Sequence, residues 1–328
     1  MLNPSQNLNP KLFDKDVELA YARDGYGKGV LEAGEKDERV VVLCADLVES
    51  TRSHWFKEKF PERYIELGVA EQNLATVASG MAVYGKIPFI SSYATFSPGR
   101  NNEQIRTTIS LNNVPVKIIG AHAGISVGPD GATHQALEDM ALMRVQPNMT
   151  VICPADMEET RKAVLESAFN GRPVYVRFGR AKTPVITTID SPFKIGKANL
   201  LRDGDKIDVA IIACGSLVHN ALVAAQELSK EGIECSVLNN HTIKPMDIDA
   251  VLAVAKKAGR VVTIEEHQVN GGMGSAVAEV LAKNYPVPME FVGVEDSFGQ
   301  SGKPEELIKH YGMDKDSIKE AVKRAIER

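Results

Sequence analysis

The sequence has few of the features that mark membrane or secreted proteins. No apolar run reaches the roughly 18 residues that span a bilayer, and residues 1–15 are polar and contain proline, unlike a signal sequence. The cysteines Cys44, Cys153, Cys214 and Cys235 stand alone in apolar runs, without the paired spacing of a disulfide framework or a zinc site. We therefore expect a cytoplasmic protein with buried, reduced thiols.

Clustered charge and internal repetition are also absent. The formal net charge is −5 over 328 residues, without a clustered basic face, so we expect no nucleic-acid partner and no membrane partner. No tandem repeat or low-complexity segment interrupts the chain. The composition, 44% hydrophobic and 25% charged, is that of a globular protein whose length suits two domains.

Strand-like apolar runs alternate with helical periodicity along the chain. This pattern predicts two consecutive α/β domains, each with a mostly parallel sheet flanked by helices. We expect the first domain at 1–181, a linker with two prolines at 182–197, and the second domain at 198–328. Strands are predicted at 39–43, 64–67, 87–92, 116–120, 150–153, 174–177, 207–213, 234–239, 260–265 and 289–294. Helices are predicted at 16–33, 74–84, 103–111, 136–143, 157–169, 217–231, 248–257, 274–284, 305–310 and 316–328.

Glu71 lies at the start of a predicted helix that is rich in small apolar residues. A helix N-terminus stabilises a carboxylate by roughly 0.3–1 kcal/mol, so one interpretation is that Glu71 only stabilises its own helix. Two further segments, 91–100 and 120–139, bring aromatic and titratable residues to similar loop positions. If these segments converge with it, Glu71 is a candidate catalytic residue.

A glycine-rich loop after one predicted strand carries His122, Asp130 and His134. Imidazole titrates near neutral pH, so these residues suit hydrogen bonding and proton transfer. A metal site is an alternative that would need a further converging ligand, and purely structural hydrogen bonds are another. Tyr93 and Phe96, three residues apart at a strand end, suit either core packing or contact with a flat heterocycle.

Polar residues follow another predicted strand, beginning at Asp46 and continuing through the loop 49–53. Ligands of open α/β sheets bind beyond the carboxyl ends of the strands, so this loop is a candidate site wall. Arg23, Arg177 and Arg180 also fall at predicted element ends. Arginine binds phosphate with two parallel hydrogen bonds, although each of these residues also suits a surface ion pair.

Taken together, these segments resemble transketolase over essentially the whole chain. The matching segments are Ala45-Asp46-Leu47 with Ser50, GVAEQN at 68–73, SYATF at 92–96, HAGISVGPDGATHQALED at 122–139, VRFGR at 176–180 and TIEEHQVNGGMGSA at 263–276. The resemblance implies a pyrimidine-binding domain followed by a transketolase carboxy-terminal domain, as in thiamine diphosphate enzymes.

The resemblance also implies cofactor-binding roles by position. Glu71 would hydrogen-bond the aminopyrimidine ring of thiamine diphosphate and promote deprotonation of the thiazolium carbon. Phe96 would stack on that ring beside Tyr93, and Asp46 would line the cofactor site.

Substrate-binding roles follow in the same way. His122 and His134 would hold the donor's hydroxyl groups and the two-carbon intermediate, and Asp130 would bind the C2 hydroxyl of the substrate. The residues that match sugar-phosphate binders are Arg23, Ser50 and Arg180. Gly99, Ala132 and Tyr93 depart from the residues usual at their positions, which leaves the donor preference open.

Transketolases also have an amino-terminal domain that binds the diphosphate through Mg²⁺, marked by a Gly-Asp-Gly motif and a later asparagine. This sequence lacks that motif, since Asp203-Gly204-Asp205 does not match it. The resemblance therefore implies the carboxy-terminal subunit of a split transketolase of the pentose phosphate pathway. A separate amino-terminal subunit would supply the Mg²⁺ ligands, with no metal ligands in this chain, and the assembly would be a dimer of heterodimers acting on sugar phosphates.

Three alternatives stay open. A deoxyxylulose phosphate synthase shares the ATHQ-type loop but is usually one long chain. The beta subunit of a 2-oxo-acid dehydrogenase has a suitable length but lacks the combination of GVAEQN and PDGATHQ. A non-catalytic regulatory partner would not need Glu71, His122, Asp130 and His134 together.

Overall fold

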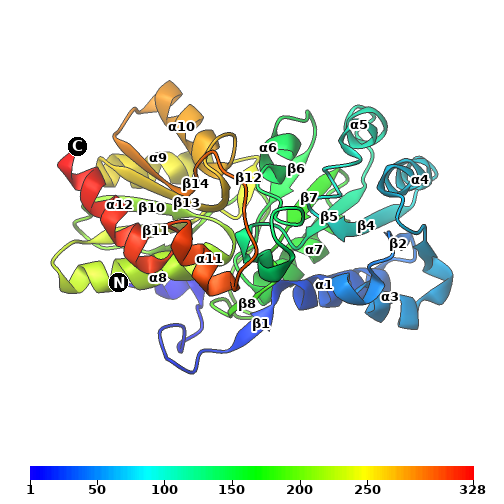
Figure 1. The fold of residues 1–328 in the computed structure, drawn as a ribbon, viewed down its shortest axis with the longest axis horizontal. Helices are drawn as coiled ribbons and strands as arrows, with labels where there is room; N and C mark the ends of the chain where they lie inside the picture. Colours follow the sequence, from blue (N-terminus) through cyan, green and yellow to red (C-terminus); the bar gives the residue numbers. More distant parts are fainter.

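The computed structural model describes residues 1–328 and contains two main β-sheets that stand side by side (Figure 1). The first sheet has 7 strands, in the order β12 (Thr242–Lys244), β6 (Thr150–Ile152), β7 (Val174–Arg177), β5 (Lys117–Ala121), β4 (Ile87–Tyr93), β2 (Val40–Cys44) and β3 (Tyr64–Glu66). All are parallel except β12, which pairs antiparallel with β6 at one edge. The inner strands are short, mostly apolar runs that are buried on both faces, as parallel sheets require, whereas the edge strand β3 is only partly buried.

Helices cover both faces of the first sheet. One face carries α1 (Ala22–Lys36), α3 (Ser53–Lys59) and α7 (Met157–Ala168), and the other carries α4 (Glu71–Val83), a π-helix (Ile105–Ser110) and α6 (Asp139–Arg144). Two short helices complete the domain, α2 (Val48–Thr51) and α5 (Asn102–Gln104). The helix predicted at 103–111 is therefore a short α-helix that continues as the π-helix.

The first predicted helix, 16–33, begins later than its periodicity indicated. Residues 19–21 form strand β1 (Leu19–Tyr21), which pairs antiparallel with β8 (Lys182–Pro184). The glycines of α1 allow a close helix crossing, since a Cβ on Gly25 would lie 2.0 Å from the Met157 carbonyl oxygen of α7. Alanine at this position would force the two helices apart.

The second sheet has 5 strands, in the order β14 (Met289–Val294), β13 (Val261–Gln268), β10 (Val209–Ala213), β11 (Cys235–Asn239) and β9 (Asn199–Arg202). Only β9 is antiparallel to its neighbour. One face carries α8 (Val218–Lys230), α11 (Pro304–His310) and α12 (Lys315–Glu327), and the other carries α9 (Ile248–Ala258) and α10 (Met273–Asn284). The prediction of two α/β domains with mostly parallel sheets is confirmed.

The two domains exchange segments. Strand β12 comes from the second half of the chain but extends the first sheet. The amino terminus lies against the second domain, where Leu2 bridges to Arg202 and Leu12 is buried among residues of α8 and α12. The segment 182–197, predicted to have little structure, includes β8, and the N–H of Thr187 donates to the buried Asp156 carboxylate at 2.6 Å.

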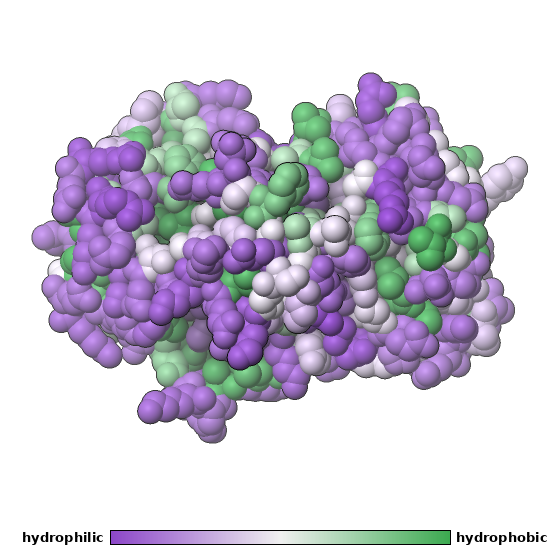
Figure 2. Space-filling model, viewed as in Figure 1, coloured by the Kyte–Doolittle hydropathy of each residue, from purple (hydrophilic) through white to green (hydrophobic).

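The remaining global features are simple. All four cysteines are buried and free, as predicted. None of the helices combines the length and the apolar character that crossing a bilayer requires. Figure 2 shows hydrophilic side chains over most of one face, with apolar residues in small separate patches.

Candidate active site

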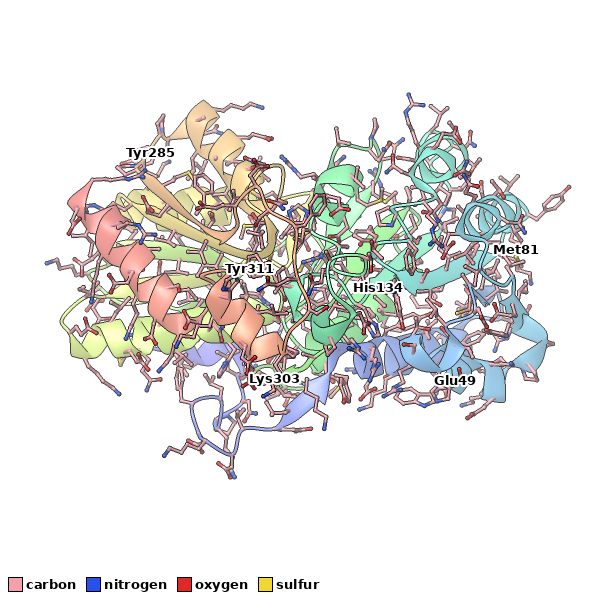
Figure 3. All side chains as sticks on the ribbon, viewed as in Figure 1. Glu49, Met81, His134, Tyr285, Lys303 and Tyr311 are labelled. Carbon is pink, nitrogen blue, oxygen red and sulfur yellow. The ribbon has the colours of Figure 1, made fainter.

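The predicted site residues gather beyond the carboxyl ends of the first sheet's strands. Asp46 follows β2, Tyr93 ends β4, His122 follows β5 and Arg180 follows β7. Because these strands are parallel neighbours, their carboxyl ends lie at one edge of the sheet, where α/β folds bind ligands. In Figure 3, His134 lies at this edge, between Lys303 of the second domain and Met81 of α4.

Four aromatic and imidazole rings form the centre of the site. The Tyr93 ring stacks on that of His122, with centroids 4.4 Å apart, and lies 6.1 Å from that of Phe96. The His134 ring meets Phe96 edge-on at 5.4 Å. The structure therefore brings together residues from β4 and from the loop 122–134, which the sequence separates.

His122 is a buried and uncharged imidazole. Burial, with the nearby guanidinium of Arg23, lowers its pKa to about 3. Arg23 Nη1 lies 3.4 Å from His122 Nε2, and since arginine only donates, this contact assigns the ring proton to Nδ1. Nδ1 is itself buried and has no partner. His122 thus offers an unused N–H donor at the site, held by a backbone with φ of 54°.

A group of arginines lies beside these rings. Arg23 Nη1 donates to the Ser50 carbonyl oxygen at 3.4 Å, and the hydroxyl of Ser50 is 2.7 Å from that of Tyr93. Burial, followed by repulsion from Arg52, lowers the pKa of Arg23. Arg180 donates to the Val127 carbonyl oxygen at 3.0 Å. The excess positive charge suits an anionic group of a substrate.

Arg177, predicted with Arg23 and Arg180 as a phosphate-binding residue, does not belong to this group. It is 3% exposed and donates to the buried carboxylate of Asp139 at 2.8 Å and to the Glu266 carbonyl oxygen at 3.1 Å. Arg52, which the sequence did not single out, lies close enough to repel the Arg23 guanidinium, although its own Nε donates to the Asp24 carboxylate at 2.7 Å. Its position within the predicted loop 49–53 was the only signal.

Asp130 and Asp46 lie at the rim. The carboxylate of Asp130 is 3.6 Å from Arg180 Nη1, and both side chains are partly exposed. Asp46 is exposed, and its backbone N–H donates to Glu66 Oε1 at 2.8 Å, which also accepts from the N–H of Gly68. The Glu66 side chain therefore ties the loop at Asp46 to the chain that leads into Glu71.

Glu71 is the first residue of α4 and is 4% exposed. Its carboxylate accepts from Ser92 Oγ at 3.4 Å and from Arg100 Nη1 at 3.2 Å. A groove of about 750 Å³ runs along Glu71, Arg100 and the first turns of α4 and α5. Arg100, which the sequence analysis missed, also covers the Phe96 ring, with its guanidinium carbon 4.2 Å from the centroid.

The second domain holds the loop that carries the histidines. The Glu266 carboxylate accepts from the backbone N–H of Ser126 at 2.5 Å. Gln135 Nε2 donates to the Gln300 carbonyl oxygen at 3.0 Å, and a Cβ on Gly299 would lie 1.8 Å from Gln135 Oε1. These contacts were not predicted, because no local pattern pairs residues so far apart.

The chain has no ready metal centre. Nowhere do three or more histidine, cysteine, aspartate or glutamate side chains gather closely enough to hold a metal ion. The arrangement instead combines a buried carboxylate, stacked rings, an unused imidazole N–H and several guanidinium groups. It suits a ligand with a flat heterocycle and a second ligand with hydroxyl groups and an anionic end.

Comparisons with known proteins agree with this chemistry. The transketolase pyrimidine binding domain matches residues 20–185, and the transketolase C-terminal domain matches residues 196–318. A 6-deoxy-6-sulfo-D-fructose transketolase subunit of Clostridium sp. is 41% identical over 96% of this chain and 98% of its own length. One of the apulose-4-phosphate transketolase subunits of Phocaeicola vulgatus is 37% identical over 90% of this chain and 94% of its own length.

A solved structure is also similar. A split gene transketolase, described as an inactive beta4 tetramer, has a TM-score of 0.87 and 44% identity, covering 94% of this chain and 98% of that one. The chain also matches human transketolase at 36% identity, but spans only 49% of its length. These matches confirm the family resemblance that the motifs indicated. The chain belongs to the transketolase family.

Proposed function

We propose that this chain is the carboxy-terminal subunit of a split transketolase of the pentose phosphate pathway. It would transfer a two-carbon ketol unit from a ketose phosphate to an aldose phosphate. The observation that carries the proposal is the convergence of Glu71, Phe96, His122 and His134 beside a group of arginines at one sheet edge. Each of these residues belongs to a segment that resembles the family's motifs.

The residues around Glu71 fit the aminopyrimidine ring of thiamine diphosphate, the cofactor on which the transketolase family depends. A buried carboxylate beside an aromatic ring can both hydrogen-bond and stack such a ring, and the groove along Glu71 opens to solvent. When bound, thiamine diphosphate supplies the electron sink for breaking and forming carbon–carbon bonds. Glu71 would hold a proton at the ring nitrogen, while Phe96, packed against Tyr93, would hold the plane of the ring.

The histidines and Asp130 would bind the sugar. The unused Nδ1–H of His122 can donate to a hydroxyl oxygen. His134 Nδ1 lies 2.9 Å from the Thr133 hydroxyl, which leaves its Nε2 for the substrate. Asp130 can accept from a substrate hydroxyl, since its carboxylate is partly exposed. Each buried donor that meets a hydroxyl would favour the sugar over an analogue that lacks it.

The anionic end of the sugar would lie against Arg23, Arg180 and Ser50, with Arg52 adding to the positive charge. Guanidinium groups bind phosphate with paired hydrogen bonds. Related subunits are named for a sulfonated fructose and for apulose 4-phosphate, and both sugars carry a tetrahedral anion. The same arginines therefore suit a sugar phosphate and, as a second candidate, a sulfonated sugar.

The Mg²⁺ ion and the diphosphate would be held by a separate amino-terminal subunit, in a dimer of heterodimers. Human transketolase is about twice as long as the matched region, and related chains of this length are named as subunits. A related split gene transketolase forms an inactive tetramer of its beta chain alone. We expect this chain to be inactive alone as well, because half of the proposed cofactor site would be missing.

Reconstitution tests the proposal. The purified chain is assayed alone and with an amino-terminal subunit, Mg²⁺ and thiamine diphosphate, using a ketose phosphate, a sulfonated ketose or pyruvate as donor. We expect turnover of a ketose donor only in the reconstituted mixture. Turnover by this chain alone would refute the split enzyme. Product from pyruvate would instead favour a deoxyxylulose phosphate synthase-like or a 2-oxo-acid dehydrogenase-like subunit, and no turnover with any donor would favour a regulatory partner.

A further inference from the structure

One arginine contacts both of the residues assigned to the pyrimidine ring. Arg100 Nη1 donates to Glu71 Oε2 at 3.2 Å, and its guanidinium carbon lies 4.2 Å from the centroid of the Phe96 ring. The Arg100 side chain is 51% exposed, whereas that of Glu71 is 3% exposed. Arg100 therefore bridges the buried carboxylate and the aromatic ring from the solvent side.

These two contacts are the ones that an aminopyrimidine would make. A guanidinium group is planar, carries N–H donors and stacks on aromatic faces. Tyr93 already stacks on Phe96, with centroids 6.1 Å apart. A further ring between them would need about 7 Å, twice the ~3.5 Å contact distance between carbon atoms. A ligand ring that stacks on Phe96 therefore has to use the space that the Arg100 guanidinium occupies.

The Arg100 side chain can leave this position without a change in its backbone. Its backbone N–H donates to the Phe96 carbonyl oxygen at 2.9 Å, and the side chain of the next residue, Asn101, donates to the Glu71 carbonyl oxygen at 3.0 Å. These bonds hold the main chain. The groove of about 750 Å³ beside it, which Gln104 also lines, has room for the guanidinium after it swings away.

We propose that Arg100 occupies the pyrimidine position in the free subunit and has to swing into the groove before the cofactor binds. This inference rests on the proposed function, because it takes Glu71 and Phe96 to be the pyrimidine contacts. Arg100 is then a determinant of cofactor affinity: molecules in which it bridges Glu71 and Phe96 do not bind the ring. The apparent affinity is then the intrinsic affinity multiplied by the fraction of molecules in the open arrangement.

The test uses the full-length chain without a partner and 4-amino-2-methylpyrimidine as the probe, since this ring lacks the diphosphate that a partner would hold. Dissociation constants are measured by NMR titration for the wild type, Arg100→Ala, Arg100→Lys and the control Arg106→Ala. Arg106 is exposed, lies in the π-helix that follows Arg100 in the chain, and makes no ion pair. We expect Arg100→Ala to bind the probe about tenfold more tightly than the wild type, a difference of about 1.4 kcal/mol.

The two other variants separate the effect of the guanidinium's shape from that of its charge. Arg100→Lys keeps the charge but loses the planar group, so we expect a smaller gain in affinity than with alanine. Arg106→Ala should bind like the wild type, because it changes the net charge equally without opening the site. If Arg100→Ala binds equally or more weakly while Glu71→Ala abolishes binding, the inference on Arg100 is wrong and the pyrimidine site stands.

If no variant binds the probe or thiamine diphosphate, even with an amino-terminal subunit, the proposed function itself fails and the inference with it. A direct measurement on the wild type needs no variant. The side-chain ¹⁵Nε signal of Arg100 should show a rigid side chain in the free chain and should change on titration with the probe. A signal that shows a flexible Arg100 side chain in the free chain would refute the arrangement in which Arg100 bridges Glu71 and Phe96.

Discussion

The carboxyl edges of the two parallel sheets differ in how their buried glutamates are satisfied. Glu265 on β13 is 1% exposed, and its carboxylate accepts from the N–H groups of Met273 and Gly274 at 2.6 and 2.8 Å, at the start of α10. Glu71 at the start of α4 is 4% exposed, yet its carboxylate accepts only from Ser92 and from the half-exposed Arg100. The second sheet's edge satisfies its glutamate with backbone N–H groups, whereas the first leaves Glu71 with side-chain donors alone.

Burial alone therefore does not distinguish a carboxylate that can bind a ligand from one that the fold already satisfies. A carboxylate that the fold satisfies with backbone N–H groups has no bonding capacity to offer a substrate. A buried carboxylate whose charged partner is a half-exposed side chain can exchange that partner for a ligand. Four predictions test this comparison.

The largest effect is expected from removal of Glu71. In the enzyme reconstituted with an amino-terminal subunit, Glu71→Ala should lower kcat by about 10²- to 10⁴-fold, the usual contribution of a proton-transfer group. The midpoint of thermal unfolding should change little, because Arg100 becomes free in solvent. Steady-state kinetics and calorimetry measure the two quantities. Unchanged turnover would remove the proposed role.

Removal of the Glu265 carboxylate should lower stability and leave kcat unchanged, the opposite of the result expected for Glu71. Glu265→Ala leaves two buried backbone N–H groups unpaired, each costing about 1–3 kcal/mol, so the free energy of unfolding should fall by about 4 kcal/mol. Urea denaturation measures this loss. The kcat per folded molecule should stay that of the wild type; a loss of kcat without a loss of stability would place Glu265 in the catalytic machinery instead.

The pH dependence of stability sharpens the same contrast. Burial raises the pKa of Glu265 to about 7 in the folded chain. Between the unfolded value near 4.5 and pH 7, the unfolded chain loses this proton and the folded chain keeps it, so stability falls as pH rises, by up to about 3 kcal/mol. The free energy of unfolding of Glu265→Gln, measured by urea denaturation at pH 5 and pH 7, should not show this decrease. A decrease equal to that of the wild type would refute the raised pKa of Glu265.

The smallest effect is expected from removal of Arg180, one of the arginines beside the rings. Arg180→Ala should raise KM for a phosphorylated acceptor about tenfold, since a charge-assisted hydrogen bond contributes roughly 1.5–3 kcal/mol and part of it is screened at this exposed site. The matched control is Arg144, which donates to the Gly271 carbonyl oxygen beside the closed edge. Arg144→Ala should lower stability without changing KM. Equal effects of both variants on KM would abolish the distinction between the edges.

Local pattern was sufficient for most helices and strands. Strand β4 ends within a residue of its predicted range and helix α7 does the same, because hydrophobic periodicity and capping depend on neighbouring residues. The failures were nonlocal. Strand β1 interrupts a predicted helix because it pairs with β8, and β12 was missed because its 3 residues extend a sheet built from the other domain.

The candidate site shows the same division. The motifs predicted Glu71, His122, Asp130 and His134 as candidates, because the spacing of these residues within each segment is specific. The arginines could not be assigned in this way. Arg177 and Arg180 are three residues apart, but Arg177 lies in strand β7 and turns into the core to pair with Asp139, while Arg180 lies beyond the strand end at the site.

By itself, the sequence determined the alternation of strands and helices, the family and the segments that carry the site, because each depends on short-range pattern. Tertiary structure decided which side chains are free to act. It closed the edge at Glu265 with backbone N–H groups, buried Arg177, brought the Gln300 carbonyl of the second domain to the histidine loop, and set Arg100 between Glu71 and Phe96. Apart from the contacts of Glu265, these arrangements depend on packing between segments far apart in the sequence, which no local pattern encodes.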